Sequence, residues 1–253
     1  MNNSNLYIEN PKIFQKYIAL TNQKQILVDM VCKKIEEKKG ATKLKFLDIG
    51  CADGYVTTQV IDRISKSYQL EINCIETSIE LINEFKTQTN YDINFINTSV
   101  ELLNKLPKSD FILIAHVVSY IEDLEKFIDK VIDSLNFKGV ALIVVSNDYS
   151  DDKKVKNFLK KQNTKDTIST NVKKILSDKK VKYEVETIMS FIDISGIKNM
   201  DKNGKTIVEF FKHKKFEDIP SNEINDIKNT ILNIANGNDK LIKREDYIWI
   251  FKD

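Results

Sequence analysis

Five short apolar runs alternate with amphipathic segments along the first 145 residues, and this alternation restricts the fold more than any other feature of the sequence. The runs lie at residues 44–49, 70–75, 93–96, 111–118 and 139–145. Hydrophobic residues at helical spacing fill three of the stretches between them: 55–65, 78–86 and 124–135. Strands that alternate with helices in this way form βαβ units with right-handed crossovers. We therefore predict an α/β fold with a mostly parallel, doubly wound, Rossmann-like sheet.

The rest of the chain is less regular. Residues 11–39 predict two helices, separated by the polar break at Thr21–Asn22. After residue 145 the pattern predicts, in order, two weak helices within the Lys-rich segment 147–180, a strand at 183–194, a turn at Asn203-Gly204, a helix at 222–234 and a last strand at 247–251. The length favours one domain, residues 1–253, with these irregular parts attached to it.

Composition excludes several classes of function. Lys and Arg number 39 against 37 Asp and Glu, so a net charge of +2 predicts no general attraction to nucleic acid or to an anionic membrane. No apolar run reaches the ~20 residues of a membrane span, and the polar N-terminus has no signal-peptide core, so we expect a cytoplasmic protein. Three cysteines without CxxC spacing and two histidines predict no metal centre.

The segment DIGCADG, residues 48–54, carries the strongest chemical signal. It follows an apolar strand and precedes a helix, so glycine gives a tight turn and the helix N-terminus offers free amide groups to a ligand. The next predicted strand ends in Glu76, where a carboxylate can accept the ribose hydroxyls of a nucleoside. Ligands of such sheets bind at the carboxyl ends of the strands.

The identity of the nucleoside follows from what the turn lacks and what it carries. The turn has neither the G-x-G-x-x-G spacing of dinucleotide sites nor the Gly-Lys-Ser/Thr of a P-loop. Asp48 would repel a pyrophosphate and suits a ligand with an ammonium end. S-adenosylmethionine is such a ligand, and Asn97-Thr98-Ser99 after the third strand adds polar groups at the same edge. The alternative is a glycine turn that closes an ordinary βα unit, with Asp48 and Glu76 merely solvated.

The same segment resembles motif I of class I methyltransferases, Asp-x-Gly-x-Gly-x-Gly, with Ala52 in place of the middle glycine. Over nearly the whole chain the sequence is similar to the histamine N-methyltransferase family, through residues 45–59, 74–78, 110–120, 142–146 and 189–195. This resemblance implies a sheet whose last strand is antiparallel. It also implies a small helical substrate lobe, formed by residues 8–39, 147–180 and 196–240.

Motif and resemblance together place a set of residues against the cofactor: Asp48, Gly50, Cys51, Gly54, Glu76, Thr77, Thr98, Ser99 and Ala115. The resemblance implies acceptor contacts from a second set: Phe14, Gln23, His116, Tyr120, Asp151 and Glu245. Four positions depart from the family, with Gln23 at an acidic position, His116 at a glutamine, and Asp151 and Val155 at two tryptophans. The departures indicate an acceptor cage that differs from one built for histamine.

We therefore predict methyl transfer from S-adenosylmethionine to a small molecule, with an amine or imidazole nitrogen as the first choice of acceptor. His116 is the candidate catalytic group, since imidazole can accept a proton from the attacking amine; the alternative is a structural histidine bonded to a backbone carbonyl. Two other functions stay open: O-methylation of a small carboxylate or hydroxyl metabolite, and a non-catalytic binding module. We expect a monomer or weak dimer, and for Asp151 a solvated loop is the alternative to a ligand contact.

Overall fold

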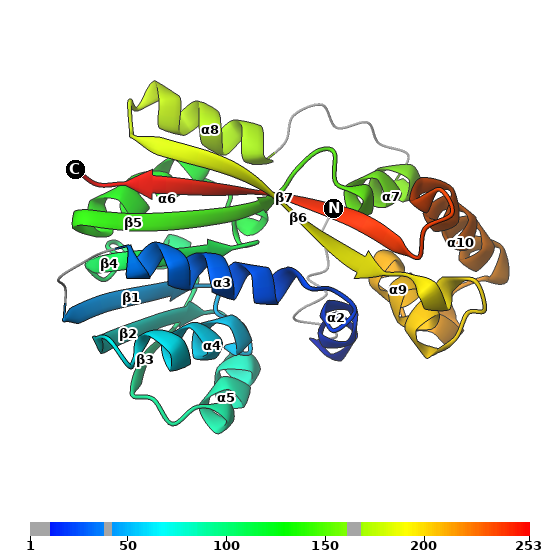
Figure 1. The fold of residues 1–253 in the computed structure, drawn as a ribbon, viewed down its shortest axis with the longest axis horizontal. Coiled ribbons are helices and arrows are strands. Elements are labelled where there is room, and N and C mark those ends of the chain that lie inside the picture. The colour runs from blue at the N-terminus through cyan, green and yellow to red at the C-terminus, as the bar shows by residue number, and fades with distance from the viewer. Residues whose placement is uncertain (1–10, 38–41, 161–167) are drawn as a thin grey trace. The chain divides into compact units, whose positions relative to one another are not determined.

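The computed structural model describes residues 11–37, 42–160 and 168–253, with the backbone alone at residues 11, 12, 14 and 160. These residues form two compact units (Figure 1). The first unit takes its residues from Met1–Ile26, Ser146–Thr167 and Ile188–Glu245, and the second takes them from Leu27–Val145, Ile168–Thr187 and Asp246–Asp253. The chain therefore passes from one unit to the other several times, and each unit is described separately below.

The sheet has seven strands in the order β3-β2-β1-β4-β5-β7-β6. Their bounds are β1 Lys43–Ile49, β2 Gln69–Glu76, β3 Ile93–Asn97, β4 Ser109–Ala115, β5 Leu135–Ser146, β6 Tyr183–Asp193 and β7 Lys240–Phe251. The first five strands pair in parallel. β7 runs antiparallel to β5, because Lys138 donates its N–H to the carbonyl of Lys252 and Lys252 donates to the carbonyl of Gly139. The mostly parallel sheet with an antiparallel last strand is confirmed.

Helices complete the second unit: most of α3 (Gln23–Glu36), then α4 (Tyr55–Ile64), α5 (Ile79–Gln88), α6 (Leu124–Ser134) and α8 (Ile168–Asp178). Two short 3-10 turns, η1 (Val100–Leu102) and η2 (Val118–Tyr120), follow β3 and β4. Residues 111–114 of β4 are all buried, as are residues 140–145 of β5. Continuous apolar burial is what a parallel strand with both faces covered requires.

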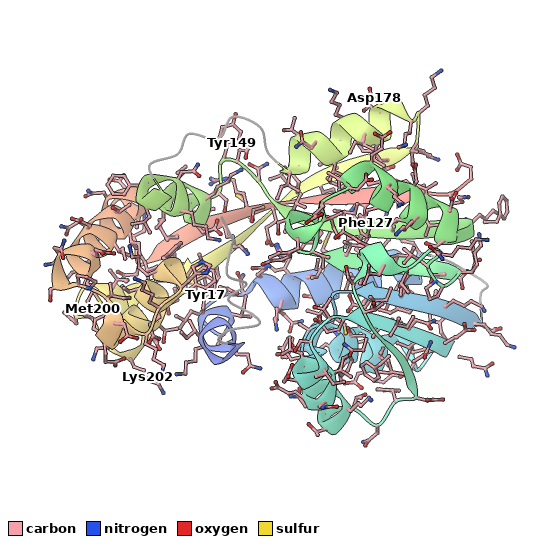
Figure 2. The ribbon with its side chains drawn as sticks, turned by 180° about the vertical axis from the view of Figure 1, so that it is seen from behind. Tyr17, Phe127, Tyr149, Asp178, Met200 and Lys202 are labelled. Carbon is pink, nitrogen blue, oxygen red and sulfur yellow. The ribbon has the colours of Figure 1, made fainter. Side chains whose placement is uncertain are left out.

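The first unit contains α2 (Pro11–Ile18), α7 (Asp151–Lys160), α9 (Lys202–Lys212) and α10 (Ser221–Ala235), together with the parts of β6 and β7 that continue into it. Its core joins these elements through Ile13, Tyr17, Ile192, Ile207 and Leu241. The ring of Tyr17 is buried and stacks on Phe210 with a centroid separation of 3.4 Å (Figure 2). Tyr17 is therefore a core aromatic of this unit.

The predicted turn at Asn203-Gly204 is wrong, because both residues lie in the first turn of α9. Asp201 caps that helix by accepting the N–H groups of Asn203 and Gly204. Gly204 is needed for a close approach, since a Cβ there would lie 2.3 Å from the carbonyl oxygen of Gly196. The glycine that looked like a turn signal is therefore a packing requirement inside a helix.

Three strands also have bounds that differ from the predicted ones. β4 ends at Ala115 and not at residue 118, β5 begins directly after α6 at Leu135, and β7 begins at Lys240. Of the segments expected in a substrate lobe, α8 and residues 27–36 of α3 pack in the second unit. Within the described part of the chain, no helix combines the length and apolarity needed to cross a membrane.

Candidate cofactor site

The glycine turn after β1 has the backbone that its sequence requires. Gly50 and Gly54 both adopt left-handed conformations, with φ of 77° and 74°, and Gly50 donates its N–H to the carbonyl of Ile75 at 2.7 Å. A Cβ at Gly50 would lie 2.3 Å from Cγ2 of Val117, and one at Gly54 would lie 2.2 Å from the ring of Phe85. Packing within the protein therefore requires both glycines before any ligand is considered.

Ala52 stands at the middle glycine position of the turn, where its backbone conformation is strained. Its φ of 50° is left-handed, which costs an L-residue about 1–2 kcal/mol. In return its N–H donates to Oε2 of Glu76 at 3.0 Å. This bond ties the turn after β1 to the end of β2, so the two predicted parts of the cofactor site are directly connected.

The carboxylate of Glu76 is held in one orientation. Its Oε1 accepts three hydrogen bonds, from the N–H and hydroxyl of Thr77 at 2.8 and 3.2 Å and from the N–H of Ser78 at 2.9 Å. Among the residues that the structure describes, Oε2 accepts one hydrogen bond, from the N–H of Ala52. A carboxylate oxygen accepts about two hydrogen bonds readily, so Oε2 keeps capacity for a ribose hydroxyl.

Asp48 is buried beneath this turn, at 4% exposure, and accepts a hydrogen bond from the hydroxyl of Thr57 in α4. Burial raises the pKa of Asp48 to about 7, the Thr57 bond lowers it, and the charge of Glu76 raises it further. A cationic group brought to this turn would lower that pKa and favour the ionised carboxylate. Asp48 is thus poised to respond to a ligand with an ammonium end.

The loop after β3 uses its polar residues within the protein. Ser99 accepts the N–H of Glu101 and so caps η1, while Thr98 is half-buried beside it. The sequence placed Asn97 at this edge but gave it no role of its own; its Nδ2 donates to the carbonyls of Glu76 and Thr77 at 2.9 Å each. Asn97 pairs with Glu76 across β2 and β3, and the sequence alone does not give the register of these two strands.

Two exposed apolar side chains were also missed at this edge. Ile79 follows β2 and is 46% exposed, and Leu102 follows β3 and is 77% exposed. Large apolar groups at the carboxyl edge of a nucleoside-binding sheet suit the faces of a purine ring. Ile79 is the first residue of α5 and Leu102 is the last residue of η1, and both are apolar at positions that solvent reaches.

His116 lies just beyond β4 and not in it. Its φ is 61°, a left-handed value that few residues other than glycine adopt, while its N–H still donates to the carbonyl of Val144 at 2.9 Å. Ala115 before it is the last paired residue of the strand. Tyr120, in η2 of the same unit, is 50% exposed. Strained backbone at the end of a strand is common where a side chain has been aimed for function.

The other predicted acceptor residues lie in the first unit. Gln23 and Glu245 are buried, and both bind the buried Lys243, whose Nζ donates to Oε1 of each and lies 3.0 Å from Glu245. Lys243 carried no signal in the sequence, since it reads as one of many lysines. Phe14 lies in α2, but its side chain is outside the described residues.

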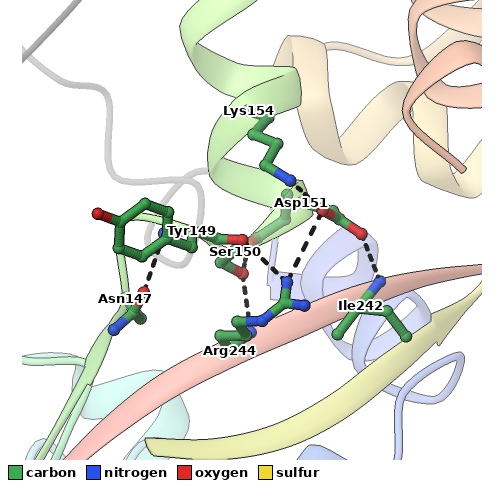
Figure 3. A network of polar contacts seen from close by, with 8 residues as sticks. Asn147, Tyr149, Ser150, Asp151, Lys154, Ile242 and Arg244 are labelled. Carbon is green, nitrogen blue, oxygen red and sulfur yellow. Dashed lines mark hydrogen bonds and ion pairs between the residues drawn. The ribbon is translucent and has the colours of Figure 1, made fainter.

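Asp151 has partners of its own at the start of α7 (Figure 3). Its Oδ2 accepts the N–H of Ile242 at 2.8 Å, and its Oδ1 binds Lys154 at 2.8 Å and lies 4.0 Å from Arg244. The residue is buried and joins α7 to β7 within the first unit. The solvated-loop alternative for Asp151 is therefore wrong, because the carboxylate is fixed by backbone and charged partners.

Cys51 and Cys74 are buried free thiols. A hydrogen bond to Cys74 and burial raise the pKa of Cys51 far above its ordinary value, so it stays a neutral thiol that packs beneath the turn. Among the residues that the structure describes, no group of His, Cys, Asp and Glu side chains could hold a metal ion.

Comparison with known proteins places this site in a family context. Residues 47–141 match the family model of a methyltransferase domain. The sequence matches no curated protein. Solved structures share the fold at low identity: the plantazolicin methyltransferase BpumL (15% identity, 98% of this chain and 92% of that one, TM-score 0.59), YcgJ of Bacillus subtilis (14%, 89% and 97%, 0.60) and a phosphoethanolamine N-methyltransferase of Haemonchus contortus (14%, 87% and 52%, 0.50).

The strand order and the glycine turn joined to Glu76 define a Rossmann-like sheet that binds a nucleoside at its carboxyl edge. Residues 47–141, which hold that turn and three of the strands in full, match the model of a methyltransferase domain. The fold and the candidate site are accordingly those of a methyltransferase that uses S-adenosylmethionine.

Proposed function

We propose that this chain transfers the methyl group of S-adenosylmethionine to a small-molecule acceptor, and that the receiving atom is the nitrogen of an amine or an imidazole. The observation that carries the proposal is His116, an imidazole on strained backbone one residue beyond β4, in the same unit as the Glu76 cradle. An amine must lose its proton to become a nucleophile, and a neutral imidazole is the side chain best matched to that task near neutral pH.

The cofactor would be held by residues of the second unit alone. Glu76 would bind the ribose through Oε2, and Asp48 would favour the ammonium end by its charge. The adenine would lie near Thr98, with Ile79 and Leu102 offering apolar contacts to its faces. Gly50, Cys51 and Gly54 shape the turn, with Thr77, Ser99 and Ala115 completing the surface. The bound cofactor supplies an electrophilic methyl group, so the protein contributes position and charge and needs no covalent step.

For the acceptor we propose contacts from the second unit. There His116 accepts the proton of the amine and Tyr120 offers an aromatic face to the positive charge that passes to the acceptor. The family resemblance alone implies acceptor contacts from Phe14, Gln23 and Glu245, which belong to the first unit. Asp151 acts there through α7, whose start it fixes to β7, and we assign it a positioning role and no contact with the acceptor.

The ligands bound to two proteins with this fold support a small acceptor. BpumL was solved with azole-containing desmethylPZN analogues and SAH, and the Haemonchus contortus protein with phosphomonomethylethanolamine and S-adenosylhomocysteine. Both acceptors are far smaller than a protein or nucleic acid. The balanced charge of this chain agrees with that size class.

A carboxylate acceptor is the second candidate, and one observation favours it. Lys243 is a buried cation bonded to Gln23 and Glu245, the two residues that the resemblance places at the acceptor. An ammonium group attracts a carboxylate and repels a cationic amine. O-methylation of a small acid would follow if Lys243, and not Glu245, sets the charge preference.

The test is a methyl-transfer screen with isotopically labelled S-adenosylmethionine against matched pairs of amines, imidazoles and carboxylates, read by mass spectrometry. We expect product from at least one amine or imidazole. Product from carboxylates alone would establish the second candidate. Tight calorimetric binding of S-adenosylhomocysteine without any turnover would instead support a non-catalytic binding module.

A further inference from the structure

The carboxylate of Glu76 is oriented by two peptide groups, and those groups are themselves held by a side chain from the neighbouring strand. The two N–H groups that bind Oε1 belong to Thr77 and Ser78. Each lies in a planar peptide unit whose other edge is a carbonyl, that of Glu76 for the first and that of Thr77 for the second. Asn97 donates to these same two carbonyls, at 2.9 Å each.

Because a trans peptide is rigid, fixing its carbonyl also fixes the direction of its N–H. One primary amide carries two N–H donors, which is the number that the two carbonyls require. The reversed amide would set an oxygen against two carbonyl oxygens, so the orientation of Asn97 is determined by the chemistry of its partners. The Asn97 amide therefore binds the carbonyl groups of two peptides, and the Glu76 carboxylate binds the N–H groups of the same two peptides.

The two oxygens of the Glu76 carboxylate accept different numbers of hydrogen bonds. Oε1 already accepts three hydrogen bonds and has no capacity left, whereas Oε2 accepts one, from Ala52. If the two peptides were free to rotate, Oε1 would lose its donors and the carboxylate could turn. We infer that Asn97 is a positioning residue of the cofactor site, which holds Glu76 so that Oε2 alone is presented to the ribose.

This inference rests on the proposed binding of S-adenosylmethionine at Glu76. Asn97 touches no cofactor atom in this scheme and acts only through Glu76. It is exposed at the end of β3, where its Cα pairs with that of Glu76. A change of its side chain should therefore leave the fold intact, so that affinity can be measured on well-folded protein.

The chain offers a matched control three positions earlier on the same strand. Asn94 is also exposed, and its Nδ2 donates to Oδ1 of Asn73 on β2 at 2.8 Å. Asn94→Asp removes an equivalent cross-strand amide bond without reaching the peptides beside Glu76. Asn97→Asp has the same shape as the native residue, loses both donors and faces two carbonyls with a negative charge.

The experiment is calorimetric titration of S-adenosylhomocysteine into six proteins: the native chain, Asn97→Asp, Asn94→Asp, Glu76→Ala, and the two double variants that combine Glu76→Ala with each asparagine change. We expect Asn97→Asp to weaken binding about tenfold, since two hydrogen bonds are lost, and Asn94→Asp to change it less than about twofold. In the Glu76→Ala background the effect of Asn97→Asp should fall below about twofold, because nothing is left to orient.

Three results would overturn the inference. Native affinity in Asn97→Asp together with weak binding by Glu76→Ala would leave the cofactor site standing and remove Asn97 from it. Equal losses in both backgrounds would show that Asn97 acts independently of Glu76. If the native chain failed to bind S-adenosylhomocysteine, the proposed function itself would fall. A selective loss of preference for S-adenosylhomocysteine over its 2′-deoxy analogue in Asn97→Asp would add support that a purely structural role cannot give.

Discussion

Asp48 gives the sharpest test of how the cofactor site is built, because its charge can be followed through protein stability alone. The side chain is buried, its one described hydrogen bond comes from Thr57, and the charge of Glu76 acts against it. Burial therefore raises its pKa from 3.8 to about 7. Between these values the folded protein keeps a proton that the unfolded chain releases, so the free energy of unfolding falls as pH rises from about 4 to 7 and the loss is complete above pH 7.

The size of the effect follows from the shift. At 1.36 kcal/mol per pKa unit, a change from 3.8 to about 7 costs the folded protein about 4 kcal/mol at high pH, of which about 2–3 kcal/mol falls between pH 5 and pH 8. Asp48→Asn keeps an oxygen that can accept from Thr57 and removes the titration. We expect the variant to gain about 2–3 kcal/mol relative to the native protein between these two pH values.

The assay is urea unfolding of the cofactor-free native protein and Asp48→Asn at pH 5 and pH 8, with the difference between the two proteins cancelling all other titrations. Thr57→Val is the matched control: it removes the bond that favours the ionised form, so the pKa of Asp48 should rise and the fall in stability should extend to higher pH. Equal pH dependence of the native protein and Asp48→Asn would refute the reasoning, since it would mean that Asp48 is already ionised at pH 5.

Four further variants probe the same edge of the sheet. Glu76→Ala should weaken binding of S-adenosylmethionine by about 2–3 kcal/mol in calorimetry, the cost of losing hydrogen bonds to a charged group; unchanged affinity would remove Glu76 from the site. His116→Asn should lower kcat/KM for the acceptor on the order of 10²–10⁴-fold at an unchanged melting temperature, because asparagine also accepts left-handed backbone; a less stable but fully active variant would make His116 structural. Gly54→Ala should destabilise the protein by more than about 2 kcal/mol in urea unfolding, through its φ and the collision with Phe85, and native stability would contradict the described turn. Ala52→Gly should gain up to about 1 kcal/mol by relieving left-handed strain, and a clear loss of stability would show that the strain is absent.

The sheet was predictable because its strands are apolar runs separated by helical periodicity, and burial on both faces leaves such runs little choice. The wrong prediction of a turn at Asn203-Gly204 has a cause outside the local sequence. Asn203-Gly204 has the composition of a turn, yet Asp201 caps the helix and Gly204 is required by the neighbouring backbone of Gly196. Local composition cannot report a contact with a residue eight positions away that approaches through the fold.

Some residues of the candidate site could be predicted from the sequence and others could not. Glu76 and the glycine turn could be predicted, since the position of a residue at a strand end fixes where its side chain lies in a parallel sheet. The role of Asn97 could not, because it depends on which residue of β3 pairs with Glu76, and register is set by long-range packing. Lys243 was hidden for another reason: burial of a lysine depends on its partners Gln23 and Glu245, which are distant in sequence.

Backbone strain gives an independent argument for where this protein works. Left-handed residues at His213 and Asn236 close α9 and α10, where the helix end itself explains them. Ala52 and His116 close no helix: they follow β1 and β4, two strands that pair directly in the middle of the sheet. Glycine would relieve the strain at either position, yet the chain carries a side chain at both. Left-handed backbone at the carboxyl ends of two adjacent central strands agrees with a ligand site at that edge of the sheet.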